Sequence, residues 1–312
     1  MPELSTSPDY MRLLPQEAAG KIGRLEFLAR GVVEGFIAGR HKSPHKGFSV
    51  EFAEHRQYVP GDDLRWLDWR VYGRSDRYYI KEFIEETNLR ATLVVDASGS
   101  MKYAGDLSAR VDGRRASKYD YARYMAAVLA YLLIHQQDAV GLVTFDVAIR
   151  RYLPAKAHAS QIRRVLEQLH ATEAGGETGL ASILHEVADR IPRRGLVIIL
   201  SDLFDDPDEL IRALHHFDYN RHEVVVFHIM AEEELTFPFG RFTDFRDLED
   251  VHAPLAVDPK AIRARYLDTV RAFVDKLERS CGQMKADYVP MTTKRSFDTA
   301  LADYLSHRRQ GR

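Results

Sequence analysis

From residue 91 to the end of the chain, short apolar runs alternate with longer amphipathic segments. Runs that predict β-strands lie at 91–96, 139–145, 148–153, 195–201, 223–229 and 286–291. Segments with apolar residues at helical spacing lie between them, at 117–137, 159–171, 180–191, 207–217 and 259–281. Strands that alternate with helices need crossover connections. The pattern therefore predicts an α/β fold with a doubly wound, mainly parallel sheet covered by helices on both faces.

Local signals refine this prediction at three places. Ser117 is a typical N-cap residue at the start of one predicted helix, and Pro207 stands at the start of another. The run 148–153 alternates between apolar and charged residues, which is typical of an edge strand.

Residues 1–90 do not follow this alternation. Apolar residues at helical spacing from Ile22 to Phe36 predict an amphipathic helix. A turn at 60–62 and a short helix beginning near Leu64 separate two β-like runs. No Pro- or Ser-rich linker follows. We therefore expect residues 1–90 to form a helix- and β-containing lobe packed on the domain at 91–312.

The charge composition argues against nucleic acid as a partner. The chain has 44 Lys and Arg residues against 46 Asp and Glu residues, so no global field favours a polyanion. Trp66 and Trp69 lie among arginines in residues 48–86, a pattern that suits stacking on a single strand. Acidic residues in the same segment cancel much of that charge. We expect ion pairs and a packed aromatic core there, and no nucleic-acid binding.

The chain also has the features of a cytoplasmic protein. Its one cysteine, Cys281, cannot form a disulfide within the chain and is expected to be a small buried hydrophobic residue. The most apolar N-terminal run, 25–39, contains Glu26, Arg30 and Glu34 and is too short to span a membrane. We expect no transmembrane segment and a cytoplasmic location.

Polar residues gather in three loops next to the predicted strands and helices. The stretches are "DASGS" at 96–100, "GGETG" at 175–179 and "LSDLFDD" at 200–206. Ligands of doubly wound sheets bind beyond the carboxyl ends of the strands, so these loops are expected to converge there. Their oxygen donors are Asp96, Ser98, Ser100, Thr178 and Asp202. Five oxygen donors with only two formal charges suit Mg²⁺ or Mn²⁺.

These motifs resemble the metal-ion-dependent adhesion site of von Willebrand factor A domains. That site reads Asp-x-Ser-x-Ser, then a distant Thr and a distant Asp, and "DASGSM", Thr178 and Asp202 match it. Segments 117–133, 138–145 and 195–203 resemble the first helix, second strand and central strand of such a domain. The resemblance implies a von Willebrand factor A-like domain at 91–312 with these five metal ligands. Glu177 departs from the pattern, because A domains commonly have Gly beside the metal-binding Thr.

A second resemblance covers more of the chain. Residues 49–86, 241–250 and 263–270 resemble the bacterial family of unknown function number fifty-eight, DUF58. Members of that family are typically encoded near AAA+ ATPases of the MoxR type. The resemblance therefore implies an adaptor that couples such an ATPase to a client protein. A carboxylate of the partner would then complete the Mg²⁺ coordination shell.

The segment 102–116 follows the Asp-x-Ser-x-Ser motif and is unusually long. We expect it to be a solvated loop. Its Arg110, Arg114 and Arg115 are candidates for shaping a partner surface.

Enzyme templates fit these residues less well. A phosphatase of the haloacid dehalogenase type needs a second Asp where this chain has Ser98. A G-x-S-x-G elbow needs Gly where it has Asp96. The sequence contains no H-E-x-x-H zinc motif and no Walker A motif. We expect no catalytic activity, and the alternative is a Mg²⁺-dependent, phosphoesterase-like hydrolase that uses Asp96.

Overall fold

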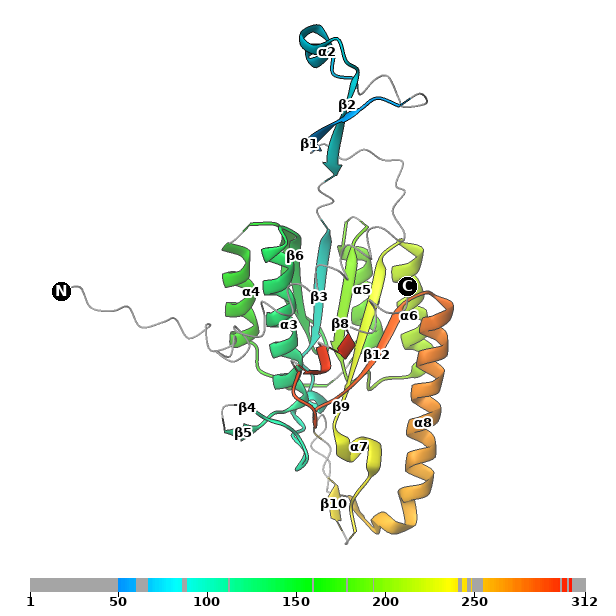
Figure 1. Ribbon diagram of the computed structural model, residues 1–312. Coiled ribbons are helices and arrows are strands. Elements are labelled where there is room, and N and C mark those ends of the chain that lie inside the picture. The colour runs from blue at the N-terminus through cyan, green and yellow to red at the C-terminus, as the bar shows by residue number, and fades with distance from the viewer. Residues whose placement is uncertain are drawn as a thin grey trace, which may run out of the picture. The chain divides into compact units, whose positions relative to one another are not determined.

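The computed structural model (Figure 1) describes residues 50–59, 67–85, 89–111, 113–158, 160–177, 179–192, 194–240, 243–245, 248, 255–297, 299–301 and 303–304. The described residues fall into two compact units, with 50–85 in one and 89–304 in the other. The predicted packing of an N-terminal lobe on the main domain stays a prediction. The predicted helix between Ile22 and Phe36 lies outside the described residues.

The larger unit is built on a six-stranded sheet with the order β12-β9-β8-β3-β6-β7. Its parallel strands are β3 (Arg90–Asp96), β6 (Ala139–Phe145), β8 (Leu196–Ser201), β9 (Glu223–Met230) and β12 (Asp287–Thr292). Strand β7 (Ile149–Lys156) is antiparallel to β6 at one edge. The predicted α/β fold with a doubly wound, mainly parallel sheet is confirmed, and so is the predicted edge strand.

Helices cover both faces of this sheet (Figure 1). One face packs against α5 (Leu180–Arg190), α6 (Pro207–Tyr219) and α8 (Pro259–Gln283), and Val94, Val143 and Val197 lie in the core between them. The other face carries α3 (Lys118–His135), which packs against α4 (Ser160–Ala171). Strand β3 is buried along nearly its whole length because both faces are covered. Cys281 is buried in the core with α5 and α6, as predicted.

Helices α3 and α6 begin where the sequence predicted. Ser117 caps α3 in a capping box with Asp120, and Pro207 is the first residue of α6, after the N-cap Asp206. The cap on α3 fixes where that helix begins. Lys118, its first residue, therefore stands near the carboxyl ends of the strands.

Shorter elements follow the carboxyl ends of the strands. They are η3 (Ser100–Lys102), β4 (Arg110–Val111), β5 (Arg114–Arg115), α7 (Glu232–Thr236), β10 (Thr243–Phe245) and β11 (Leu255–Val257). Figure 1 shows β4, β5, α7 and β10 beyond the same end of the sheet, where the carboxyl ends of the parallel strands lie. Among the described residues, no helix combines the length and apolar character needed to cross a membrane.

The smaller unit contains an antiparallel pair, β1 (Val50–Gln57) and β2 (Tyr79–Glu85), and helix α2 (Trp69–Ser75). The short helix expected near Leu64 thus begins at Trp69, where Asp68 caps its first turn. Trp66 lies outside the described residues. The expected packed aromatic core is wrong for Trp69, whose residue surface is 65% exposed.

Asp138 links the starts of β3 and β6, because its Oδ1 accepts a hydrogen bond from the Leu89 N–H (3.0 Å). Burial raises the pKa of Asp138 to about 7, and the Leu89 hydrogen bond offsets part of this effect. An acid whose pKa is raised by folding stabilises the protein fully only below its unfolded pKa. That stability is lost as the pH rises through the folded value.

We predict that Asp138→Asn makes the free energy of unfolding less dependent on pH between about 4 and 7, because Asn keeps an acceptor for Leu89 and never ionises. Urea denaturation of both proteins at several pH values measures this. The variant should gain stability relative to the wild type as the pH rises. A constant difference across this range would contradict the buried, titrating carboxyl group.

Candidate metal centre

Asp96 and Asp202 lie at the carboxyl ends of neighbouring strands in the middle of the sheet. Asp96 is the last residue of β3, and Asp202 directly follows β8. From β3 the chain proceeds to β6 and β7 on one side, and then returns to place β8 on the other. These two ends therefore flank the topological switch point, where doubly wound sheets bind ligands. The structure brings together here the two predicted carboxylates from separate loops.

The Asp96 side chain is fully buried and accepts hydrogen bonds on both oxygens. Its Oδ1 accepts from the Ser98 backbone N–H (2.9 Å), and its Oδ2 accepts from the Ser201 hydroxyl (2.6 Å). The Ser201 Oγ also accepts a hydrogen bond from the Leu203 N–H (2.9 Å). Ser201 was not predicted as a site residue. It fixes the orientation of Asp96 across the two strands.

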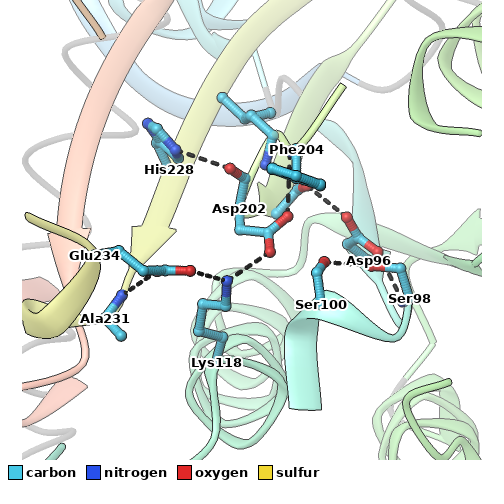
Figure 2. Close-up of polar contacts among 11 residues, drawn as sticks. Asp96, Ser98, Ser100, Lys118, Asp202, Phe204, His228, Ala231 and Glu234 are labelled. Atoms are coloured by element: carbon cyan, nitrogen blue, oxygen red, sulfur yellow. Dashed lines mark hydrogen bonds and ion pairs between the residues drawn. The ribbon is translucent and has the colours of Figure 1, made fainter. Parts of the chain in front are cut away.

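The two predicted serines lie between the carboxylates. The hydroxyl oxygens of Ser98 and Ser100 are 3.1 Å apart. Ser98 also bonds Asp96 through its side chain, and Ser100 bonds Asp202. Four oxygen-bearing groups thus follow one another from β3 to β8 (Figure 2).

The fifth predicted ligand, Thr178, lies outside the described residues. The preceding part of its loop runs beside the motif: Gly175 donates a backbone hydrogen bond to Ala97 O (2.7 Å), and Gly99 donates one to Gly176 O (2.8 Å). A Cβ at Gly99 would lie 2.8 Å from that oxygen and 2.5 Å from the Leu248 carbonyl oxygen, so the close approach requires glycine.

Arg150 anchors the same loop from β7. Its guanidinium donates to Glu173 O (2.7 Å), to Gly175 O (2.9 Å) and to the Asp146 carboxylate (2.5 Å). No sequence motif pointed to Arg150 or Asp146. Glu177, the departure from the A-domain pattern, is exposed.

The structure adds a buried lysine to the site. The Nζ atom of Lys118 lies 2.7 Å from Asp202 Oδ2 and 2.7 Å from Glu234 Oε1, and the Lys118 side chain is only 3% exposed (Figure 2). Glu234 comes from α7, where its Oε2 also accepts from the Ala231 N–H (2.7 Å). One ammonium group therefore joins the start of α3, the end of β8 and α7.

Burial and neighbouring charges set the protonation of these groups. Burial, together with repulsion from Asp202, raises the pKa of Asp96 to about 7, and hydrogen bonds from Ser201 and Ser98 offset part of the rise. For Asp202 burial acts in the same direction, but the Lys118 ammonium outweighs it and lowers the pKa of Asp202. Burial alone would lower the pKa of Lys118, and the two carboxylates raise it instead.

His228, on the neighbouring strand β9, holds the backbone of the loop after β8. Its Nε2–H donates to the Asp202 carbonyl oxygen (2.9 Å), and its Nδ1 contacts the Tyr288 hydroxyl. Burial lowers the pKa of His228 to about 4. A neutral ring with its proton on Nε2 fits this hydrogen bond, so Asp202 is held through both its side chain and its backbone.

These residues fit a divalent cation. When Asp96 is ionised, Asp96, Asp202 and the partly exposed Glu234 carry three negative charges against one positive charge on Lys118, which leaves two negative charges at the site. In the part of the chain that the structure describes, Asp96 forms no salt bridge, so its buried charge has hydrogen bonds but no cation. No group of three His, Cys, Asp or Glu residues able to hold a metal occurs among the described residues. A centre here therefore depends on the serine hydroxyls, and hard oxygen donors are those that Mg²⁺ prefers.

Helix α7 also connects the site to the 102–116 segment. The Leu107 N–H donates to Glu233 Oε1 (2.7 Å), and the Ala109 N–H donates to Thr293 O (2.7 Å). The segment was expected to be a solvated loop. The structure instead attaches it to α7 and to the end of β12, and its Arg114 and Arg115 side chains are exposed.

The strand order, the connections and the Asp-x-Ser-x-Ser loop at the switch point define a von Willebrand factor A-like α/β domain. The model of the family described as "Protein of unknown function DUF58" matches residues 54–274, and the chain belongs to this family. The resemblance predicted from the sequence is confirmed.

Curated relatives are similar over nearly the whole chain. Uncharacterized protein Rv1480 of Mycobacterium tuberculosis (strain H37Rv) is 27% identical over 300 residues, which cover 94% of this chain and 90% of that protein. Uncharacterized protein Mb1516 of Mycobacterium bovis gives the same values.

Solved structures show weaker similarity. The conserved hypothetical protein BatB from Bacteroides thetaiotaomicron is 16% identical, covers 71% of this chain and 99% of its own, and has a TM-score of 0.45. The SpRpn10 VWA domain is 12% identical, covers 68% of this chain and 94% of its own, and has a TM-score of 0.40. These TM-scores are low, so the fold assignment rests on the strand order and connections of this chain.

We predict that Lys118→Met lowers the free energy of unfolding by about 3 to 5 kcal/mol, because it leaves the buried Asp202 carboxylate and the partly exposed Glu234 carboxylate without their shared cation. Urea denaturation in the absence of divalent cations measures the loss. Lys102→Met is the matched control, since Lys102 is an exposed lysine in the neighbouring turn. Equal stability of the two variants would show that the Lys118 ion pairs contribute nothing.

Proposed function

We propose that this protein is a metal-dependent protein-binding adaptor that works with a AAA+ ATPase of the MoxR type in the assembly, maturation or regulation of client proteins. One observation supports the metal-dependent part most. Asp96, Ser98, Ser100 and Asp202 form a continuous set of oxygen donors at the switch point. Membership of the DUF58 family supports the choice of ATPase, because the resemblance to this family implies a MoxR-type partner.

The residues of the site would hold Mg²⁺ or Mn²⁺ through Asp96, Ser98, Ser100 and Asp202, with Thr178 as the fifth proposed ligand. A bound ion would supply an open coordination position for a carboxylate of the partner protein. The Ser201 hydroxyl, 2.6 Å from Asp96 Oδ2, keeps the Asp96 side chain turned toward Ser98 and Ser100. The Lys118 ammonium group keeps the Asp202 carboxylate in place. Because two of the described donors are neutral hydroxyls, a cation keeps much of its charge for one further carboxylate.

The hydrolase alternative has less support from the geometry. Asp96 is fully buried, so a phosphoester has no direct access to its carboxylate oxygens. The proposal therefore includes no catalytic step. It includes a cytoplasmic location, where the ATPase has access to ATP.

We predict that the wild type binds Mg²⁺ and that Asp96→Ala abolishes this binding, because the substitution removes the buried carboxylate that has no cationic partner. Isothermal titration calorimetry measures the binding, and circular dichroism shows whether the fold is kept. Glu177→Ala is the control, since it removes an exposed carboxylate next to Thr178 and should leave Mg²⁺ binding unchanged. Mg²⁺ binding that survives in Asp96→Ala would refute the proposed centre.

We further predict that EDTA or Asp202→Asn weakens a purified complex with a MoxR-type ATPase, or with its client, by at least about tenfold. Truncating one member of a desolvated charge pair costs roughly 2 to 5 kcal/mol, and each ~1.4 kcal/mol is about tenfold in affinity. Surface plasmon resonance with the ATPase from the same organism measures the effect. A complex indifferent to both treatments would make any bound metal structural and place the contact elsewhere.

A further inference from the structure

The exposed large apolar side chains of the larger unit are unevenly distributed. In the described part of this unit they are Leu107, Val147, Phe204, Tyr219, Leu235 and Leu248. Five of the six lie in segments that follow the carboxyl ends of strands, and only Tyr219, the last residue of α6, lies toward the opposite edge. Single exposed apolar residues are normal on any protein. A concentration at the edge formed by the carboxyl ends of the strands, around the candidate metal centre, is typical of an interaction surface.

Phe204 is the member of this set nearest to the proposed ligands. It lies two residues after Asp202, and its backbone N–H donates to Asp202 Oδ1 (3.3 Å), as Figure 2 shows. The residue is nevertheless 69% exposed. The preceding Leu203 has a φ of 55°, a left-handed conformation that is uncommon for a leucine. The turn thus keeps the Phe204 backbone at the centre while leaving its ring in solvent.

Val147 and Leu107 are also exposed side chains on backbone segments that hydrogen bonds hold in place. The residues on both sides of Val147 bond each other, with Asp146 N–H donating to Ala148 O (3.1 Å) and Ala148 N–H donating to Asp146 Oδ1 (3.2 Å). Leu107 is held through its own N–H by Glu233. Because these backbones are fixed, little conformational entropy remains to be lost when a partner covers the side chains.

Charged side chains of both signs lie at the same edge. Lys102 is exposed and its Nζ lies beside Gly175, and Arg114 and Arg115 project from the β4–β5 hairpin. Arg115 pairs with Asp106 within its own segment, and Arg114 lies 3.8 Å from Asp120. Lys102, which lies beside the loop of the centre, favours an acidic partner residue there over a basic one, although the exposed Asp106, Glu177 and Asp206 oppose this farther from it.

We propose that this edge binds a protein segment in which an acidic side chain stands between large apolar side chains. The apolar residues of the partner would contact Phe204 and Val147, and the carboxylate would lie at the centre between them. This inference rests on the proposed function for the carboxylate. It adds the apolar contacts, which supply affinity that the charge alone does not.

The test uses the full chain with Mg²⁺ and four pools of short synthetic peptides carrying a fluorophore. The pools contain Glu between Leu and Phe, Glu between Ser residues, Gln between Leu and Phe, and Lys between Leu and Phe. Fluorescence anisotropy should show the tightest binding for the first pool. Phe204→Ser should weaken it by about tenfold, as expected for an aromatic anchor, and Val147→Ser by less. Tyr219→Ser, an exposed aromatic on the opposite edge, should leave the affinity unchanged.

Several outcomes would overturn the proposal. Equal binding of the two Glu pools, or equal losses in Phe204→Ser and Tyr219→Ser, would show that the apolar residues around the centre do not recognise the partner. If those results come with EDTA-sensitive binding, the proposed function stands without this inference. Equal binding of the Glu and Gln apolar pools that still depends on Phe204 would refute the metal-bound carboxylate and leave only an apolar contact.

A membrane is the other surface that apolar and basic residues together fit. Sedimentation with vesicles of phosphatidylglycerol and phosphatidylcholine tests this possibility on the same variants. Vesicle binding that is lost in Phe204→Ser, without preference for any peptide pool, would assign the edge to lipid and overturn the proposal. We expect no sedimentation of the wild type with these vesicles.

Discussion

The buried ammonium group of Lys118 is the interaction on which the arrangement of the candidate centre depends. It lies 2.7 Å from a carboxylate oxygen of Asp202 and 2.7 Å from one of Glu234. An unpaired carboxylate at this depth would protonate or draw in water. With Lys118 present, Asp202 stays ionised and in place, and α7 is held against the start of α3. The pairing therefore positions one proposed ligand and also the helix that carries the neighbouring segment.

Because Lys118 is already shared between two carboxylates, it leaves Asp96 without a cation. The two aspartates have opposite pKa shifts for this reason: Lys118 lowers the pKa of Asp202, whereas burial and repulsion raise the pKa of Asp96. A second lysine beside Asp96 would pair with its carboxylate and weaken the case for a metal. The chain instead supplies two serine hydroxyls there. The site thus combines negative charge that lacks a cation with oxygen donors. This combination is the physical basis for the proposed divalent cation.

The sequence predicted the parts of this structure that depend on local pattern. The strands and helices, the cap at Ser117 and the position of Asp96 at a strand end follow from periodicity and from residue types at neighbouring positions. Ser201, Lys118 and Arg150 were not found, because their roles come from partners that only folding brings close. Lys118 bonds residues 84 and 116 positions away, and in the sequence it is simply a lysine in the first turn of a helix. The prediction for Trp69 was wrong for another reason: an aromatic residue among charged residues fits a packed core and an exposed site equally well.

The proposed centre and the apolar side chains around it would recognise a partner through two contacts of different physical character. A coordinated carboxylate contributes a strong contact, but almost every protein surface offers such a group, so this contact alone distinguishes few partners. Apolar side chains on fixed backbones discriminate by shape and gain nothing from acidic residues alone. In this chain the groups for both contacts are attached to the same loops: the turn that presents Phe204 is also the turn that holds Asp202. If Mg²⁺ binding shifted Asp202, this turn would carry the shift to Phe204 and to the proposed apolar contact.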